Sequence, residues 1–325
     1  MALHGLPIEA EGALGSVWVL TCERNCSGRG LHRSGPLVRI NWSTRRIVQR
    51  IGVVDPTAFA IGGGAIWLTH FNLGSVSRVD PRTGHTTQTV SLALPTPIVA
   101  GDRQFLPVNI SAGAGSVWVS TARGWLAQID PDSSRVVRMV HAPFDVTGQV
   151  VVSPDATWVA ENSLGVGVMR AGSRRLKLLR IKSGPAGAIS VDQLALGGGR
   201  VRAYAEIAAG ATRNGGGVST NMARVAVLDQ RTGRVIRQLT LPDGPYEIAY
   251  GSGDLFAASY RTGRLFRIDA SYRIHPLHTL GGPGVLIAIT RGVIWTANKF
   301  GVMRRITIPT QITGEGRSAP GQPYP

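Results

Sequence analysis

Two side chains of the sequence, His70 and Glu161, are of the types that transfer protons or ligate a divalent metal. Each lies three residues after a tryptophan in a short apolar run, GGGAIWLTH for His70 and SPDATWVAEN for Glu161. An imidazole and a carboxylate can act as an acid/base pair if the fold brings them together. Neither belongs to a specific motif, and the sequence contains no nucleophile elbow, GxxxxGKS/T phosphate loop or HExxH.

The tryptophans that precede these residues belong to a longer repeat. A glycine-rich turn followed by a short apolar run recurs along the whole chain, with an average spacing of about 46 residues, which is typical of propeller blades. In successive copies the central residue of the run is Trp18, Trp67, Trp118, Trp158, Arg202, Phe256 and Trp295. Seven copies indicate seven blades.

Each copy contains four short strands. A strand such as TAFAIGG precedes the run, and two alternating strands follow it, as in SVSRVDPRTGHTTQTV, where Asp80-Pro81 and Thr83-Gly84 favour a hairpin. We therefore predict an all-β fold, a seven-bladed β-propeller with four-stranded blades. The aromatic residues of the repeat should pack between adjacent blades, where they bury the most area.

The two ends of the chain bear on ring closure. We predict that the propeller spans residues 1–313 and that the Pro/Gly/Ser-rich residues 314–325 form a disordered tail. Little sequence remains for a fourth strand after VMRRITI, so we expect an incomplete seventh blade or a chain that is one piece of a longer protein. Upstream residues could carry an export signal and an extracytoplasmic location; without them the location would be cytoplasmic. No apolar stretch is long enough for a transmembrane segment.

Three connections between the expected strands are longer than the others. They are residues 21–36 in the first blade, 94–107 between the second and third blades, and 205–222 in the fifth. In a propeller, the connection after the second strand and the connection between blades emerge on the same face. All three should therefore lie on one face, and because loops commonly carry function, this face is the candidate binding surface.

The same face should receive the residues that follow the second strands. They include carboxylates, an imidazole, amides and cations, a set that could orient a polar ligand over the central channel. The candidate residues are His70, Phe71, Arg123, Glu161, Asn162, Glu206, Tyr260, Arg261, Asn298 and Lys299.

The repeat units GSVWV and SRVDPRTG, with the alternating strand that follows, resemble the bacterial YVTN, YncE-like propeller family over nearly the whole chain. That resemblance implies a binding role, mostly extracytoplasmic, rather than one reaction. The chain is more distantly similar to the streptogramin B (virginiamycin B) lyases, metal-dependent propellers whose repeats tend to place Glu three residues after Trp. This second resemblance implies catalysis by His70 and Glu161 with a divalent metal such as Mg²⁺. The equivalent positions of other blades hold Thr21, Thr121, Ser259 and Asn298.

Charge and cysteine content suggest two further features. The chain has 35 Lys and Arg against 19 Asp and Glu, a net charge of +16 that could attract nucleic acid or another anionic polymer. Several arginines should instead lie at hairpin turns on the outer rim of the other face, as solvated edge charges: Arg82, Arg135, Arg231, Arg234 and Arg273.

Cys22 and Cys26 are close enough for a local disulfide in an oxidising compartment, whereas nearby residues do not complete a metal site.

The sequence therefore leads to three functional hypotheses. The first is a non-enzymatic, monomeric propeller that needs no cofactor and binds an unidentified ligand or protein partner on the face with the long loops. The second is a metal-dependent lyase of the streptogramin B type that uses His70 and Glu161. The third is binding of nucleic acid or an anionic polymer through the basic surface.

Overall fold

The computed structural model describes residues 1–325 except 24–33, 93–106, 123, 145, 147, 162–164, 182–187, 210–217, 243, 260, 280–283, 291 and 309–325. Regular structure in the described part consists of β-strands, arranged in seven antiparallel sheets. No helix among the described residues is long and apolar enough to span a membrane.

The strands of each sheet follow one another in the chain, from the inner to the outer edge of a blade. Blade 1 comprises β1 (Leu6–Ala13), β2 (Ser16–Cys22), β3 (Ser34–Asn41) and β4 (Ile47–Val54). Blade 2 comprises β5 (Pro56–Gly62), β6 (Ala65–His70), β7 (Ser75–Val79) and β8 (Thr86–Ser91). Blade 3 comprises β9 (Pro107–Gly113), β10 (Ser116–Thr121), β11 (Trp125–Asp130) and β12 (Arg135–His141). Blade 4 comprises β13 (Val150–Ser153), β14 (Ala156–Glu161), β15 (Gly165–Arg170) and β16 (Lys177–Arg180).

The remaining blades follow the same plan. Blade 5 comprises β17 (Ala188–Gly197), β18 (Arg200–Ala209), β19 (Val218–Asp229) and β20 (Val235–Leu241). Blade 6 comprises β21 (Pro245–Gly251), β22 (Asp254–Ser259), β23 (Arg264–Ile268) and β24 (Ile274–Thr279). Blade 7 has three strands, β25 (Gly284–Thr290), β26 (Val293–Asn298) and β27 (Met303–Thr307).

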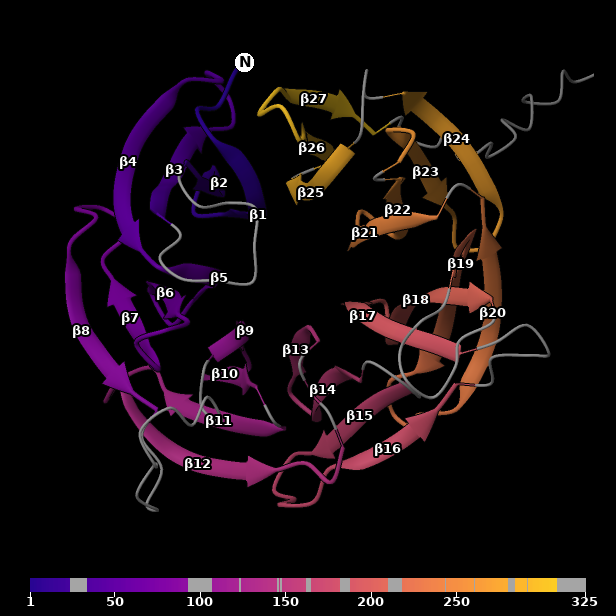
Figure 1. Ribbon diagram of the computed structural model, residues 1–325, viewed down its shortest axis with the longest axis horizontal. Coiled ribbons are helices and arrows are strands. Elements are labelled where there is room, and N and C mark those ends of the chain that lie inside the picture. Colours follow the sequence, from indigo (N-terminus) through magenta and orange to yellow (C-terminus); the bar gives the residue numbers. More distant parts are fainter. Residues whose placement is uncertain are drawn as a thin grey trace, which may run out of the picture.

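The seven sheets surround a common axis, with the inner strands nearest to it (Figure 1). Each inner strand contacts the inner strands of its two neighbours, and β1 meets both β5 and β25. The ring is therefore closed between the first and last blades. The predicted seven-bladed β-propeller is confirmed, as is the incomplete seventh blade.

The first residues of the chain take part in closing the ring. Ala2 forms a β-bridge with Val302, and the backbone N–H of Leu3 donates to the carbonyl of Gly301 at 2.7 Å. The N–H of Met303 donates to the carbonyl of Met1 at 2.9 Å, and the Leu3 side chain is buried in the core shared by blades 7 and 1. The few residues before β1 thus pair with the start of β27 in the three-stranded blade.

The hydrophobic core consists of clusters that each join two adjacent blades. Trp18 packs between blades 1 and 2, Trp67 between blades 2 and 3, and Trp158 between blades 4 and 5, all fully enclosed. Phe256 and Trp295 occupy the same place between blades 6 and 7 and between blades 7 and 1. The structure therefore confirms that the aromatic residues of the repeat hold neighbouring blades together.

Candidate functional site

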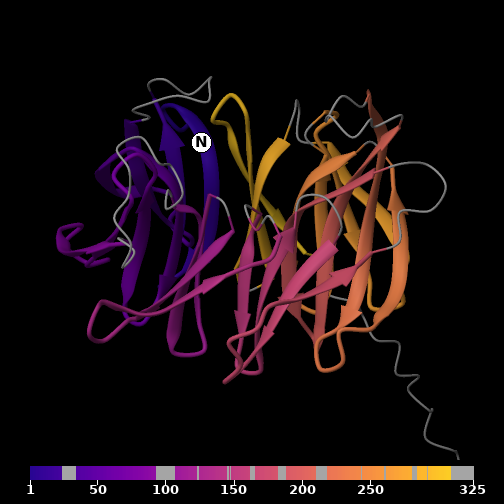
Figure 2. The ribbon, with the colours of Figure 1, turned by 60° about the horizontal axis from the view of Figure 1, so that its bottom comes forward.

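The strand connections fall on two faces, which we call the loop face and the turn face (Figure 2). On the loop face, the second strand of a blade ends and the inner strand of the next blade begins. On the turn face, the first strand is joined to the second by two residues, as at 14–15, 63–64 and 252–253. The connections of eight or more residues, from β2 to β3, β8 to β9, β12 to β13 and β18 to β19, all leave from the loop face.

The three loops predicted from the sequence are shorter than expected: residues 21–22 and 34–36 belong to β2 and β3, and Pro107 begins β9. The largest difference is in blade 5. Residues 205–209 and 218–222 are strand rather than loop, because β18 and β19 stay paired through Ala208 with Ser219 and Ala209 with Val218. Both segments satisfy their backbone hydrogen bonds by extending the hairpin. The interiors of the three connections, residues 24–33, 93–106 and 210–217, lie outside the described residues.

His70 ends β6 on the loop face, but its side chain is enclosed between blades 1 and 2. Its Nδ1 lies 2.6 Å from the carbonyl oxygen of Val54, and its Nε2 lies 2.7 Å from the hydroxyl oxygen of Ser77. Because a carbonyl can only accept, Nδ1 carries the proton and donates, while Nε2 accepts from Ser77. Both ring nitrogens of this buried side chain are thus engaged within the protein.

Replacing His70 with alanine should destabilise the propeller by about 1–3 kcal/mol, because it leaves the Ser77 hydroxyl and the Val54 carbonyl without their buried partner. Urea denaturation of the variant measures this loss. The exposed His85 provides a matched control, and its replacement by alanine should leave stability nearly unchanged. Unaltered stability of His70→Ala, together with loss of a metal-induced stabilisation, would favour a ligand role instead.

Glu161 ends β14 in blade 4, and only 1% of its surface is exposed. It therefore belongs to the second blade after that of His70. No group of three His, Cys, Asp or Glu side chains in the described ranges could hold a metal ion. The use of His70 and Glu161 as an acid/base or metal pair therefore stays a prediction, with the two residues in different blades.

Among the other candidate residues, those that the structure describes cap their own connection or lie at least partly exposed on the loop face. The side-chain oxygen of Asn298 accepts from the backbone N–H of Phe300 and of Val302, each at 3.0 Å, and so caps the turn between β26 and β27. Arg261 and Lys299 are exposed, and Phe71 is half-buried. Glu206 lies in β18, with its side chain outside the described part. Also outside it are Arg123, Asn162 and Tyr260, as well as Cys26, so the disulfide with Cys22 stays a prediction.

A set of polar side chains not identified from the sequence lies on the inner strands or, for Gln149, directly before one. Five blades carry a Glu, Gln or Asn nine residues before the central residue of the repeat, where blades 2 and 7 have Ala58 and Leu286. We call this set the polar belt; its members are Glu9, Asn109, Gln149, Gln193 and Glu247. The nine-residue spacing is visible in the sequence and could have identified them.

Members of the polar belt join one inner strand to the inner strand of the next blade. A carboxyl oxygen of Glu9 accepts from the N–H of Phe59 at 2.7 Å, and the amide oxygen of Gln149 accepts from the N–H of Leu194 at 2.7 Å. Gln193 accepts from the N–H of Ile248 at 2.9 Å and donates to the Glu247 carboxyl at 2.8 Å. The belt satisfies backbone donors where the register of inner strands shifts, as between Val191 and Gln193.

The carboxyl groups of Glu9, Glu11 and Glu247, which lie on inner strands, have pKa values above the ordinary value for glutamate. The pKa of Glu9 is raised to about 8, chiefly by burial; the N–H of Phe59 lowers it by less, and the nearby charges of Glu11 and Glu247 add smaller increases. Burial likewise raises the pKa of Glu247 to about 8 and that of Glu11 to about 7. A proton is therefore held among these carboxyl groups near neutral pH.

Comparison with known proteins supports the fold. No family model and no curated protein matches the sequence. Hydrazine synthase of Kuenenia stuttgartiensis has a similar structure, with a TM-score of 0.70 and 14% identity over 93% of this chain and 95% of that one. The WD40 domain of Neurospora crassa Pan2 gives a TM-score of 0.70 and 11% identity over 95% and 90%. A streptogramin B lyase has a TM-score of 0.65 and 16% identity over 94% of this chain and 96% of that one.

At these identities the likeness concerns the architecture alone. The chain is a seven-bladed β-propeller, a class whose members include a WD40 domain and a lyase among the similar structures. Because the same scaffold supports unrelated functions, its role has to be argued from its own surfaces.

Proposed function

We propose that this chain is a non-enzymatic binding propeller whose ligand or protein partner contacts the loop face. The observation that carries the proposal is the placement of its longest connections. Those of eight or more residues, from β2 to β3, β8 to β9, β12 to β13 and β18 to β19, share one face, whereas turn-face connections have two to six residues. The closed ring does not need these additional residues, and loops on a rigid scaffold are the usual carriers of binding function.

The lyase hypothesis receives less support from the side chains. A metal ligand needs a free lone pair, but Nε2 of His70 accepts from Ser77 and Nδ1 donates to Val54. The described residues therefore do not fit the metal that the resemblance to streptogramin B lyases implies, and we assign no catalytic step to them.

The hairpin of β18 and β19 allows a clean test of the loop face. Residues 210–217 can be replaced by Asn-Gly, because Ala209 and Val218 are direct antiparallel partners and a two-residue turn closes such a pair. The matched control replaces residues 131–134 on the turn face by Asn-Gly between the partners Asp130 and Arg135.

The full chain is first screened by thermal shift against metabolites and divalent metals, since a ligand that binds the folded state raises the midpoint. We expect a ligand whose affinity falls at least about tenfold in the loop-face variant, a loss of about 1.4 kcal/mol, and stays unchanged in the turn-face variant. Equal loss in both variants, or metal-dependent turnover, would contradict the proposal. Binding of a nucleic acid that weakens steeply with salt in both variants would favour the basic-surface hypothesis.

A further inference from the structure

Blade 5 departs from the repeat at the position that joins neighbouring blades. Where other blades have Trp or Phe, its second strand has Arg202, which is 8% exposed. In three other blades an arginine instead covers the tryptophan from the third strand, as Arg39 covers Trp18 with its guanidinium carbon 5.1 Å from the ring centre. Blade 5 thus places a cation where its counterparts place an aromatic ring.

Arg202 keeps one contact of the residue it replaces. In blade 2 the indole Nε1 of Trp67 donates to the carbonyl of Gly62 at 3.1 Å. In blade 5 the Nη1 of Arg202 donates to the equivalent carbonyl of Gly197 at 2.9 Å. One side of the guanidinium is therefore anchored to the turn between β17 and β18.

The missing aromatic ring is supplied by the next blade. Tyr250 of β21 occupies the inner-strand position that Ala112 holds in blade 3, beside Trp67. The guanidinium carbon of Arg202 lies 3.9 Å from the centre of the Tyr250 ring. A Cβ atom on Gly198 would come within 2.6 Å of the Tyr250 hydroxyl oxygen, so a larger residue there would displace the tyrosine ring. The residues around Arg202 are thus adapted to a stacked guanidinium.

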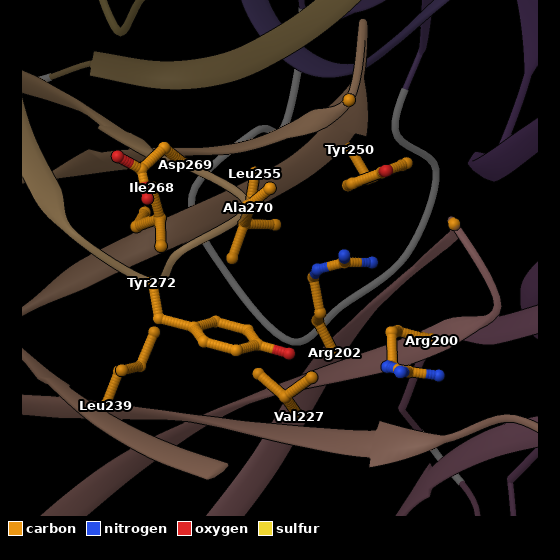
Figure 3. A pocket seen from close by; sticks show the side chains of 12 residues that line it. Arg200, Arg202, Val227, Leu239, Tyr250, Leu255, Ile268, Asp269, Ala270 and Tyr272 are labelled. Carbon is orange, nitrogen blue, oxygen red and sulfur yellow. The ribbon is translucent and has the colours of Figure 1, made fainter. Parts of the chain in front are cut away.

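A cavity of about 190 Å³ lies between blades 5 and 6 on the turn face. A cavity of about 150 Å³ occupies the equivalent place between blades 3 and 4, where Trp118 lines it at the position of Arg202. Figure 3 shows the Arg202 guanidinium among the lining side chains, with the Tyr250 ring on one side and the Tyr272 hydroxyl directed towards it. Apolar side chains, including Val227 and Leu255, line the rest. The cavity is smaller than the ~300 Å³ at the lower end of drug-sized ligand sites, so its ligand would have to be smaller than a typical drug.

Three of the residues that line the cavity, Arg200, Arg202 and Asp269, carry charges, and Arg202 is the one without a partner of opposite charge among the described residues. Arg200 pairs with Asp229 at 3.0 Å, and Asp269 is bound by His275 at 2.8 Å and by backbone donors of its own turn. No carboxylate among the described residues pairs with Arg202, although burial lowers its pKa by disfavouring the charge. Arginine remains cationic in proteins, and a buried cation without a counter-ion is costly.

We propose that this cavity binds the carboxylate of a small organic monoanion, with Arg202 as the cation that receives it. One unpaired positive charge balances one negative charge, and Asp269 at the far side disfavours a dianion. The apolar lining and the Tyr272 ring accommodate an unsaturated or aliphatic body. The site is on the face opposite to the loop face and is independent of the function proposed above.

Benzoate is the probe, titrated into the full chain by isothermal calorimetry at low salt, with neutral benzamide and dianionic phenyl phosphate as comparisons. Arg202→Met removes the charge while keeping an unbranched side chain. The double variant Arg202→Trp/Tyr250→Ala rebuilds the pairing of Trp67 and Ala112 and removes the guanidinium from the cavity. Arg78→Met is the matched control, because Arg78 covers Trp67 in blade 2, away from this cavity. Thermal melts establish that each variant folds.

We expect saturable benzoate binding that weakens at least about tenfold in both Arg202 variants, and remains in Arg78→Met. Benzamide should bind at least about tenfold more weakly than benzoate. Absence of saturable benzoate binding to the folded wild type overturns the proposal, as does binding that survives in both Arg202 variants. Tighter binding of phenyl phosphate than of benzoate overturns the assignment to a monocarboxylate.

Discussion

Replacing Trp67 with alanine should lower the free energy of unfolding by about 3–5 kcal/mol, the range measured for large aromatic residues removed from protein cores. Trp67 is fully buried among residues from blades 2 and 3, and its indole donates to the carbonyl of Gly62. Its removal leaves a cavity and an unsatisfied carbonyl at the same place. Both effects act on the contact between two blades, on which the ring depends.

Chemical denaturation, followed by tryptophan fluorescence and by far-UV circular dichroism, measures this loss. Trp125→Ala is the matched control, because Trp125 is half-buried at the start of β11 and packs edge-on against His141. We expect the control to lose less than half as much stability. If Trp67→Ala lost no more than Trp125→Ala, the inter-blade clusters would not be the principal source of stability.

The fold could be predicted from the sequence because its determinants are local and repeated. The apolar runs around Trp18, Trp67, Trp118 and Trp158 recur at a spacing that only a repeat architecture explains. Turn residues such as Thr83-Gly84 marked the hairpins independently. Ring closure was less accessible, because pairing of Ala2 with Val302 joins residues at opposite ends of the chain.

The site residues were harder to predict because burial and partners depend on the neighbouring blade. The sequence places His70 after a second strand, but the carbonyl of Val54 in blade 1 and the hydroxyl of Ser77 in blade 2 determine what its nitrogens can do. Arg202 was visible as a departure from the repeat. Its stacking partner, Tyr250, belongs to another blade, so the cavity between them could not be foreseen.

The polar belt leads to the second large expected effect, a loss of stability as the pH rises. The pKa values of Glu9 and Glu247 are raised from 4.5 to about 8 in the folded protein. The folded state therefore binds more protons than the unfolded state between these values, and stability falls with increasing pH in that interval. The contribution of these groups is complete below about pH 4.5 and is lost as the pH rises through about 8.

The double variant Glu9→Gln/Glu247→Gln should be more stable than the wild type at pH 8.5, with a midpoint higher by on the order of 5 °C, and its stability should depend less on pH between 5 and 8.5. Glutamine keeps an oxygen that can accept from the N–H of Phe59 but cannot ionise. The protein already uses Gln149 and Gln193 at the equivalent positions of blades 4 and 5. The double variant therefore places in blades 1 and 6 the residue type that blades 4 and 5 already have at this position.

Thermal melts of the wild type and variants across this pH range test the prediction, with Glu23→Gln as a control that removes one exposed carboxylate. The control should follow the wild-type profile, because its side chain lies outside the belt. A double variant that is less stable than the wild type at pH 8.5 would show that ionised carboxylates, with their stronger hydrogen bonds to backbone donors, hold the inner strands together. Stability that falls with rising pH in the wild type, and less so in the double variant, indicates that Glu9 and Glu247 are protonated and leave the inner strands uncharged. Stability that does not fall with rising pH indicates ionised carboxylates, which would attract cations.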